Sequence, residues 1–258
     1  MLLERRPGAA VGEHVLRYCA YSERTGVPTR QREPLSPSVV LIFGIGSRLR
    51  VEGEALETFV GGLGDVCPVI EHDGEMHGIQ VDLDPLGARM LLGVPMHELA
   101  RRSVPLEEVM GAEAHVLEER LYEARSWDER IEIVDRTLER KLRDAPAPPP
   151  DITWAWKRLV QSDGRLRTSE VAAALGCSGK HLAARFREHV GLPPKTVARI
   201  ARFKRATELL SAHSLAEVAH ACGYYDQSHL DRDFRDFAGT TPSSYRRDPR
   251  AVTFFQDA

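Results

Sequence analysis

Residues 227–237 place hydrogen-bonding side chains along one face of an expected helix. The apolar residues are spaced i, i+4 and i+7, which predicts one buried stripe formed by Leu230, Phe234 and Phe237. The opposite face then carries three polar side chains, Ser228, Arg232 and Arg235. Hydroxyl and guanidinium groups donate hydrogen bonds to DNA phosphates and to the edges of bases. This face could therefore bind DNA if the neighbouring elements present it.

A second expected helix precedes this one and ends at Gly223. Its apolar residues are Val218, Ala219 and Cys222. Two helices joined by a short turn that contains glycine, the second with a basic outer face, have the plan of a helix-turn-helix. The segment over 214–238 is therefore predicted to be one.

The same arrangement occurs twice. The segment EVAAALG at 170–176 matches EVAHACG at 217–223, 47 residues later. At an offset of 48 residues, four positions of the first copy match four of the second: Leu182, Phe186, Gly191 and Pro194 against Leu230, Phe234, Gly239 and Pro242. A long amphipathic helix is expected over 194–213. The repeat predicts two helix-turn-helix motifs joined by a rigid helix.

Residues 214–247, SLAEVAHACGYYDQSHLDRDFRDFAGTTPSSYRR, resemble the signature of the AraC/XylS family of transcriptional regulators. The matching positions include Ala219, Gly223, Ser228, Arg232, Phe234, Gly239, Pro242 and Tyr245. RFKRATELL at 202–210 resembles the linking helix of that family, and the resemblance covers about residues 152–248. It implies an all-α domain that binds double-stranded DNA in a sequence-specific way.

The amino-terminal part resembles the companion domain of a less characterised, actinobacterial-type branch of the same family. The resemblance rests on HGIQVDLDPLGARMLLGVP at 77–95 and on SWDER at 126–130. It implies a regulatory domain that senses a small molecule or mediates dimerisation. RNA polymerase is a further expected partner, and activation and repression both stay open.

The resemblance places base contacts at equivalent positions of the two second helices. These positions are Lys180, Ala183, Ala184, Gln227, Ser228, His229 and Arg232. The outward faces and the first helix start add three more DNA-binding candidates, Ser178, Arg187 and Arg235. A rigid connection would hold the two helices roughly 34 Å apart, in adjacent major-groove segments. Because Ala183 and Ala184 donate no side-chain hydrogen bonds, the first copy is expected to contribute positioning more than specificity.

Acidic residues in the second of these helices raise an alternative. Asp231 with Arg235 and Arg232 with Asp236 are i,i+4 pairs, which we favour over an aspartate that accepts a hydrogen bond from a cytosine amino group. On the linking helix three arginines share a flank that we expect to be solvated rather than bound to phosphates: Arg199, Arg202 and Arg205.

The chain divides at DAPAPPPD, residues 144–151, because a run of prolines favours an extended spacer. We predict a regulatory or dimerisation domain over 1–145, a linker over 146–151, the DNA-binding domain over 152–250 and a tail over 251–258. Residues 151–258 hold 17 Lys and Arg against 12 Asp and Glu, whereas residues 1–150 hold 18 against 26. A basic half beside an acidic half indicates that the carboxyl half faces the polyanion.

Short segments rich in β-branched residues come first in the amino-terminal half, and helical periods follow Pro85. Strands are expected over 14–21, 38–45, 49–53, 57–62 and 78–83. This order predicts an α+β fold, with a small cupin-like β-barrel or sandwich followed by helices. The helical segments over 112–124 and 126–142, the latter with Ser126 as N-cap, either form a dimer surface or pack on the barrel.

Residues 71–84 are rich in acidic residues and histidine, the side chains that bind metal ions. They include His72, Asp73, Glu75, His77, Asp82 and Asp84, but their spacing lacks the H-x-H pattern of barrel metal sites. We favour a solvated hairpin and expect no metal. Trp154 and Trp156 are expected to be core anchors, and Tyr224 and Tyr225 one core and one turn residue.

No catalytic motif is present: there is no G-x-S-x-G, no Walker sequence and no Cys–His pair in a readable context. We therefore expect no enzyme activity and no cofactor. Two alternatives stay open, a regulator without a ligand and an enzyme fused to a DNA-binding domain. Four scattered cysteines, Cys19, Cys67, Cys177 and Cys222, fit a reducing cytosol, and no apolar run could span a membrane.

Overall fold

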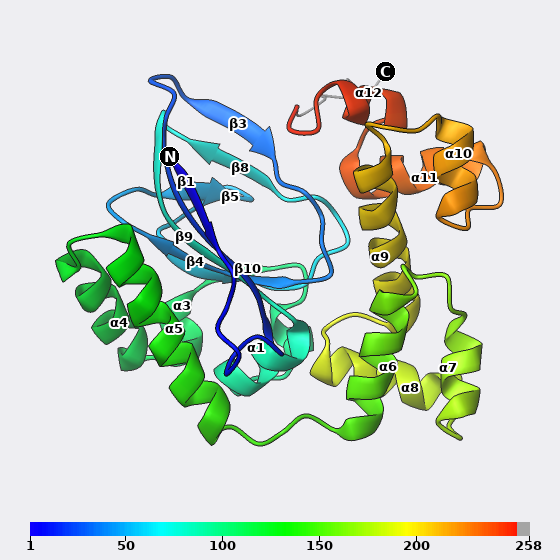
Figure 1. The fold of residues 1–258 in the computed structure, drawn as a ribbon, viewed down its shortest axis with the longest axis horizontal. Helices are drawn as coiled ribbons and strands as arrows, with labels where there is room; N and C mark the ends of the chain where they lie inside the picture. The colour runs from blue at the N-terminus through cyan, green and yellow to red at the C-terminus, as the bar shows by residue number, and fades with distance from the viewer. Residues whose placement is uncertain (252–258) are drawn as a thin grey trace.

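The structure, a computed structural model, describes residues 1–251, so all but one residue of the expected tail lies outside the described part. The amino-terminal half begins with two antiparallel sheets (Figure 1). The six-stranded sheet has the order β1-β2-β9-β4-β7-β10, and the four-stranded sheet has the order β3-β8-β5-β6. The strands are β1 Leu2–Arg5, β2 Val15–Arg24, β3 Thr29–Arg32, β4 Val39–Gly44, β5 Leu49–Val51, β6 Glu54–Leu56, β7 Thr58–Gly61, β8 Val69–His72, β9 Glu75–Leu83 and β10 Ser103–Pro105.

Five helices follow or accompany the sheets. They are α1 Pro85–Leu92, α2 Met96–Leu99, α3 Leu106–Met110, α4 Ala112–Glu123 and α5 Trp127–Asp144. Strands followed by helices confirm the predicted α+β class. The short strands β1, β3, β6, β8 and β10 carry too little pattern to be predicted from the sequence.

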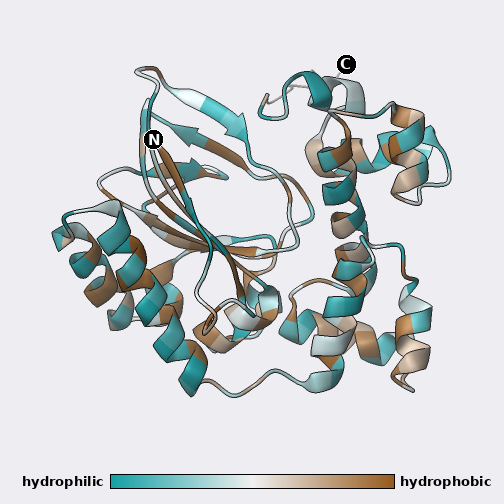
Figure 2. Ribbon diagram, in the orientation of Figure 1, coloured by the Kyte–Doolittle hydropathy of each residue, from teal (hydrophilic) through white to brown (hydrophobic). Residues whose placement is uncertain are grey.

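Helix α5 packs on β2 and on α1, and α4 packs on α5 and α3. The apolar residues of α5 that point inward are buried: Ile131, Val134, Leu138 and Leu142. The hydroxyl of Tyr18 on β2 donates to the Asp135 carboxylate of α5 at 2.7 Å. Of the two predicted alternatives, the structure therefore supports packing on the sheet. Figure 2 shows the brown apolar stripes of these helices beside teal polar ones.

The predicted hairpin over 71–84 is wrong. Strand β8 pairs with β3 and β5, whereas β9 pairs with β2 and β4, so the chain passes from one sheet to the other at Asp73 and Gly74. Gly74 has a φ of 115°, which favours glycine. His72 is buried and its Nδ1 accepts from the Gly74 amide. Among residues 1–251 no three metal-binding side chains gather in one place.

The carboxyl-terminal half is helical throughout the described residues. Its helices are α6 Pro150–Gln161, α7 Thr168–Ala174, α8 Gly179–His189, α9 Pro194–Leu209, α10 Leu215–Ala221, α11 Gln227–Ala238 and α12 Pro242–Arg247. In Figure 1, α9 connects one group, α6–α8, to a second group, α10–α12. In the part of the chain that the structure describes, no helix combines the length and the hydropathy that crossing a membrane requires.

The two halves meet over a short connection and several direct contacts. Ala145–Pro149 joins α5 to α6, and Pro150 begins α6, because proline is tolerated in the first turn of a helix. The Cys67 amide donates to the Phe237 carbonyl of α11 at 2.6 Å. Buried residues of both halves belong to one continuous apolar cluster. The two halves are thus packed against each other. The domain limits predicted from the sequence remain a prediction.

Candidate nucleic-acid interface

The second helix-turn-helix consists of α10, a turn and α11. The Ser214 hydroxyl caps α10 by accepting from the Glu217 amide, and the Glu217 carboxylate accepts from the Ser214 amide, which forms a reciprocal capping box. The turn begins at Gly223, whose φ is 73°. Asp226 then caps α11 by accepting from the His229 amide at 2.8 Å. As predicted, Tyr224 is buried while Tyr225 in the turn is 94% exposed.

One face of α11 is the predicted core. Leu230, Phe234 and Phe237 are almost fully buried, and the ring of Phe203 on α9 lies 4.7 Å from that of Phe234. Packing against α9 fixes the rotation of α11. The predicted DNA-binding residues on its other face are exposed: Gln227, Ser228, Arg232 and Arg235. His229 is half-buried, with its ring edge-on to Tyr224.

The predicted ion pairs within α11 are wrong. Arg199 of α9 donates to Asp233 Oδ1 at 2.6 Å and to Asp236 Oδ2 at 2.6 Å. Asp233 is 1% exposed, so its charge is buried against the guanidinium of the neighbouring helix. Within the described residues, Arg232 and Arg235 form no ion pair. Two of the three acidic charges of α11 are thus neutralised from behind, and the outward arginines stay available.

The arginines of α9 are structural. Arg202 donates to the Gly164 carbonyl at 2.8 Å, and its guanidinium lies over the Tyr224 ring. Arg205 pairs with Glu208. The predicted solvated flank is therefore wrong for Arg199 and Arg202, because α9 is the central helix against which its neighbours pack.

The first helix-turn-helix consists of α7, a turn at Gly176 and α8. Ser178 caps α8 by accepting from the His181 amide at 3.2 Å. Leu182, Phe186 and Val190 form the predicted buried stripe. Of the DNA-binding candidates in this first copy, Ala183 is half-buried. The other four are exposed: Ser178, Lys180, Ala184 and Arg187.

Comparisons with known proteins also identify a helix-turn-helix domain in the carboxyl-terminal half. A family model described as a helix-turn-helix domain matches residues 171–248. The Msm operon regulatory protein of Streptococcus mutans is 28% identical over 96 residues, and the F1 operon positive regulatory protein of Yersinia pestis is 36% identical over 76 residues. The carboxyl-terminal domain is an AraC-type helix-turn-helix domain. The matches span 36% and 29% of this chain, but only 34% and 25% of those relatives.

Outside the AraC-type domain the similarity concerns the fold. Apo ToxT from Vibrio cholerae aligns with a TM-score of 0.50 over 94% of this chain and 99% of its own, at 11% identity. ToxT solved with an unsaturated fatty acid bound also aligns with a TM-score of 0.50, over 94% of this chain and 96% of its own. The fold is therefore shared along nearly the whole chain.

Helices α8 and α11 are the two recognition helices that the sequence predicts to enter DNA, and α8 lies against the amino-terminal half. Helix α8 packs on α2 and α1. The following Gly191 has a φ of 99°, and a Cβ at this position would lie only 3.0 Å from the Met96 carbonyl oxygen. His189 at the end of α8 is half-buried, and burial lowers its pKa. Trp156 is buried as predicted, but Trp154 is 39% exposed, so its predicted core role is wrong.

A basic groove of about 590 Å³ lies between the two helix-turn-helix copies of the AraC-type domain. Its lining includes exposed cations that the sequence did not single out, Arg165, Arg167 and Lys195, next to Arg232. Their basic character was the one sequence signal that could have identified them, because they lie in neither α8 nor α11. An anion such as a DNA phosphate is the ligand that this lining favours.

Proposed function

We propose that the protein is a sequence-specific transcriptional regulator that places α8 and α11 in adjacent major-groove segments on one face of double-stranded DNA. The observation that carries this proposal is the outward face of α11. Its polar side chains are exposed, while Arg199 holds Asp233 and Asp236 from behind. A helix rich in aspartate can therefore approach a polyanion.

Roles follow from the chemistry of each side chain. Arg232 can donate two hydrogen bonds to a guanine, and Gln227, Ser228 and His229 at the helix start can reach neighbouring bases. Arg235, Lys180 and Arg187 are suited to contacts with DNA phosphates. Ser178, at the start of α8, can contact the DNA backbone. Ala183 and Ala184 offer only apolar contact, for example to a thymine methyl group.

The basic groove supports binding of the strand that runs between the two recognition helices. DNA whose major groove holds both α8 and α11 must pass this region. Arg165, Arg167 and Lys195 would then face its phosphates. Phosphate contacts position a protein and make its binding dependent on salt. We assign no catalytic step to the protein.

The amino-terminal half is proposed to regulate DNA binding, either by sensing a small molecule or by forming a homodimer. ToxT shares this fold and has been solved with a fatty acid bound, which supports a small-molecule effector here. A regulator without a ligand stays the alternative. The Yersinia relative is named a positive regulatory protein, so we propose activation, with RNA polymerase as partner, in the cytoplasm.

Selection from a random DNA pool at fixed salt tests this function. The full chain should enrich two half-sites about 10 bp apart, centre to centre. Arg232→Ala should lose preference at one base position, whereas a control on α5, Arg136→Ala, should select the wild-type site. A pool without enrichment would contradict the proposal.

A further inference from the structure

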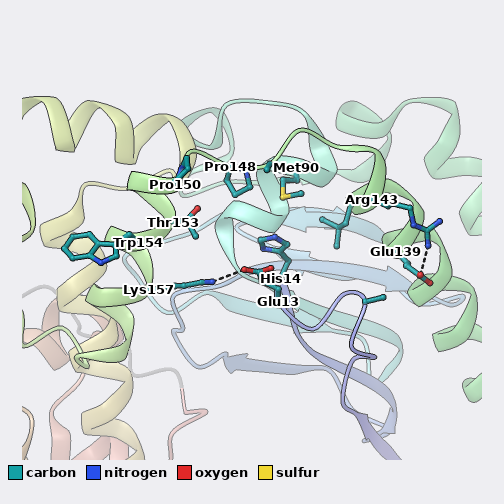
Figure 3. A pocket seen from close by; sticks show the side chains of 13 residues that line it. Glu13, His14, Met90, Glu139, Arg143, Pro148, Pro150, Thr153, Trp154 and Lys157 are labelled. Carbon is teal, nitrogen blue, oxygen red and sulfur yellow. Dashed lines mark hydrogen bonds and ion pairs between the residues drawn. The ribbon is translucent and has the colours of Figure 1, made fainter. Parts of the chain in front are cut away.

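A cavity of about 620 Å³ opens where the amino-terminal half meets the first helix of the DNA-binding domain (Figure 3). Its walls come from the loop before β2, from α1, from the end of α5, from the connection at 147–148 and from α6. Its volume falls within the range of small-molecule sites in proteins, roughly 300–1,000 Å³. Both halves of the protein contribute, so a bound molecule would touch both.

Much of the lining is apolar. Met90 of α1, Leu142 of α5 and Pro148 of the connection face the cavity together with Trp154 of α6. Trp154 is 39% exposed. Large apolar side chains that gather at an open cavity favour a ligand with an apolar, planar body.

Charged side chains stand around this apolar lining. Lys157, one turn after Trp154 on α6, donates to Glu13 Oε1 at 2.9 Å, and Arg143 pairs with Glu139 at 2.6 Å. Figure 3 shows both pairs, with His14 between them. The side chains of Lys157 and Glu13 are 46% and 63% exposed. An exposed pair of this kind contributes little free energy, so a ligand can replace one partner at small cost.

His14 also lines the cavity, beside the Lys157–Glu13 pair. Its Nδ1 lies 3.2 Å from Asp84 Oδ1, and that carboxylate also accepts from the Gly87 amide at the start of α1. The hydrogen bond to Asp84 raises the pKa of His14. The Asp84 carboxylate is buried and already bonded to His14 and to the Gly87 amide, so it offers no acceptor to the cavity.

We propose that this cavity binds a small aromatic carboxylic acid, with its ring against Trp154 and its carboxylate on Lys157 in place of Glu13. This inference rests on the proposed function, since such an acid would be the effector. Helix α6 packs on α9 and α8, so a ligand that ties α6 to the amino-terminal half also fixes the first helix-turn-helix. Binding of the acid should therefore change the affinity for DNA.

Three matched probes test the charge of the ligand: indole-3-acetate, indole-3-ethanol and tryptamine. They share one ring system and differ in a carboxylate, a hydroxyl and an ammonium group. In calorimetric titrations of the full chain, indole-3-acetate should bind more tightly than either of the others. The preference should reach about fivefold, the worth of one exposed ion pair, in the full chain carrying Glu13→Gln, where the carboxylate displaces no partner of Lys157. Preference for tryptamine, or no binding of any probe, would overturn the proposal.

Variants locate the site. Lys157→Met should weaken indole-3-acetate and leave indole-3-ethanol unchanged, while Glu13→Gln should strengthen the acid by removing its competitor. Trp154→Ala should weaken all three probes. Arg136→Met on the exposed face of α5 is the control. Binding that Lys157→Met and Trp154→Ala leave unaltered would place the probe elsewhere and overturn the site.

The DNA readout is kept separate from the titration. If the full chain enriches no DNA sequence but binds the acid with this variant pattern, the site stands and the proposed function fails. If the chain selects its half-sites and the probes do not bind, the function stands and this inference fails. Where both hold, indole-3-acetate at saturation should shift the Kd for the selected DNA severalfold in the wild type and not in Lys157→Met.

Discussion

The two helix-turn-helix copies agree on their inward side and differ on the side that faces away. Phe186 and Phe234 occupy equivalent buried positions, 48 residues apart. On the outside, Ala184 stands where the second copy has Arg232. The packing against a central helix dictates the first pair, whereas the outward position is free to vary. The same backbone plan therefore carries two surfaces with unequal capacity for hydrogen bonds.

The ion pair that ties each recognition helix to its supporting helix is reversed between the copies. In the first, Arg185 of α8 donates to Asp151 of α6, at 2.8 and 3.2 Å. In the second, Asp233 of α11 accepts from Arg199 of α9. Both partners are offset by 48 residues, so the acid and the base have exchanged places. Helix α6 thus supports the first copy as α9 supports the second.

Removing the central phenylalanine should give the largest effect in both copies. Phe186→Ala and Phe234→Ala are each expected to lower the free energy of unfolding by about 3–5 kcal/mol, because each leaves a cavity in a closed core. Urea denaturation followed by circular dichroism measures this loss. A loss in one copy only would break the comparison, since it would show that the two cores carry unequal shares of the stability.

The reversed ion pairs should differ in strength because they differ in burial. Arg199→Met leaves the Asp233 carboxylate, 1% exposed, without its partner and should cost about 2–3 kcal/mol, somewhat less than a fully buried pair because Arg199 itself is one-third exposed. Arg185→Met frees Asp151, which is 41% exposed, and should cost less than about 1 kcal/mol.

A charge exchange is the control for this pair. Arg199→Asp should be as harmful as Arg199→Met or more so, and the addition of Asp233→Arg should recover part of the loss by recreating the arrangement of the first copy. Equal losses for Arg199→Met and Arg185→Met in urea denaturation would show that burial does not separate the two pairs.

The sequence predicts the inward side of this comparison and misses the ties between helices. Helical periodicity identifies Leu182, Phe186, Leu230 and Phe234 as core, because a period of 3.6 residues determines which side chains share a face. Pairs at i,i+3 and i,i+4 are the ion pairs that the pattern of one helix can suggest. Arg199 and Asp233 are 34 residues apart, so their contact depends on how α9 crosses α11.

The cavity beside α6 could not be predicted for a similar reason. Glu13 and Lys157 are 144 residues apart, and Trp154 has the spacing of a core residue. Trp154 is exposed at the cavity between the two halves, and no periodic pattern records how the halves meet. The caps at Ser126 and Ser178 and the α+β order, in contrast, depend on local sequence, and the structure shows them.

Exchange of the outward residues sharpens the comparison at the DNA. Arg232→Ala should weaken specific binding by about 1–3 kcal/mol and relax one base position. The mirror change, Ala184→Arg, should add a preference at one position of the other half-site, if both helices enter the groove in the same way. Selected pools from the two variants, compared with the wild type at one salt concentration, measure both. An Ala184→Arg pool identical to that of the wild type would show that the two helices dock differently.

The smallest expected difference concerns acid. His189 in the first copy is equivalent to Phe237 in the second, and burial lowers the pKa of His189 below its usual 6.5. In the unfolded chain this histidine takes up a proton as the pH falls through 6.5, whereas the folded chain resists it. The contribution to stability is therefore present above pH 6.5 and is lost as the pH falls toward the lowered pKa of the folded state. His189→Phe, which copies the second motif, should lose this part of the acid sensitivity. Urea denaturation at pH 7.5 and pH 5.5 compares the two proteins, and an unchanged pH dependence in His189→Phe would mean that the histidine titrates freely despite its position against the amino-terminal half.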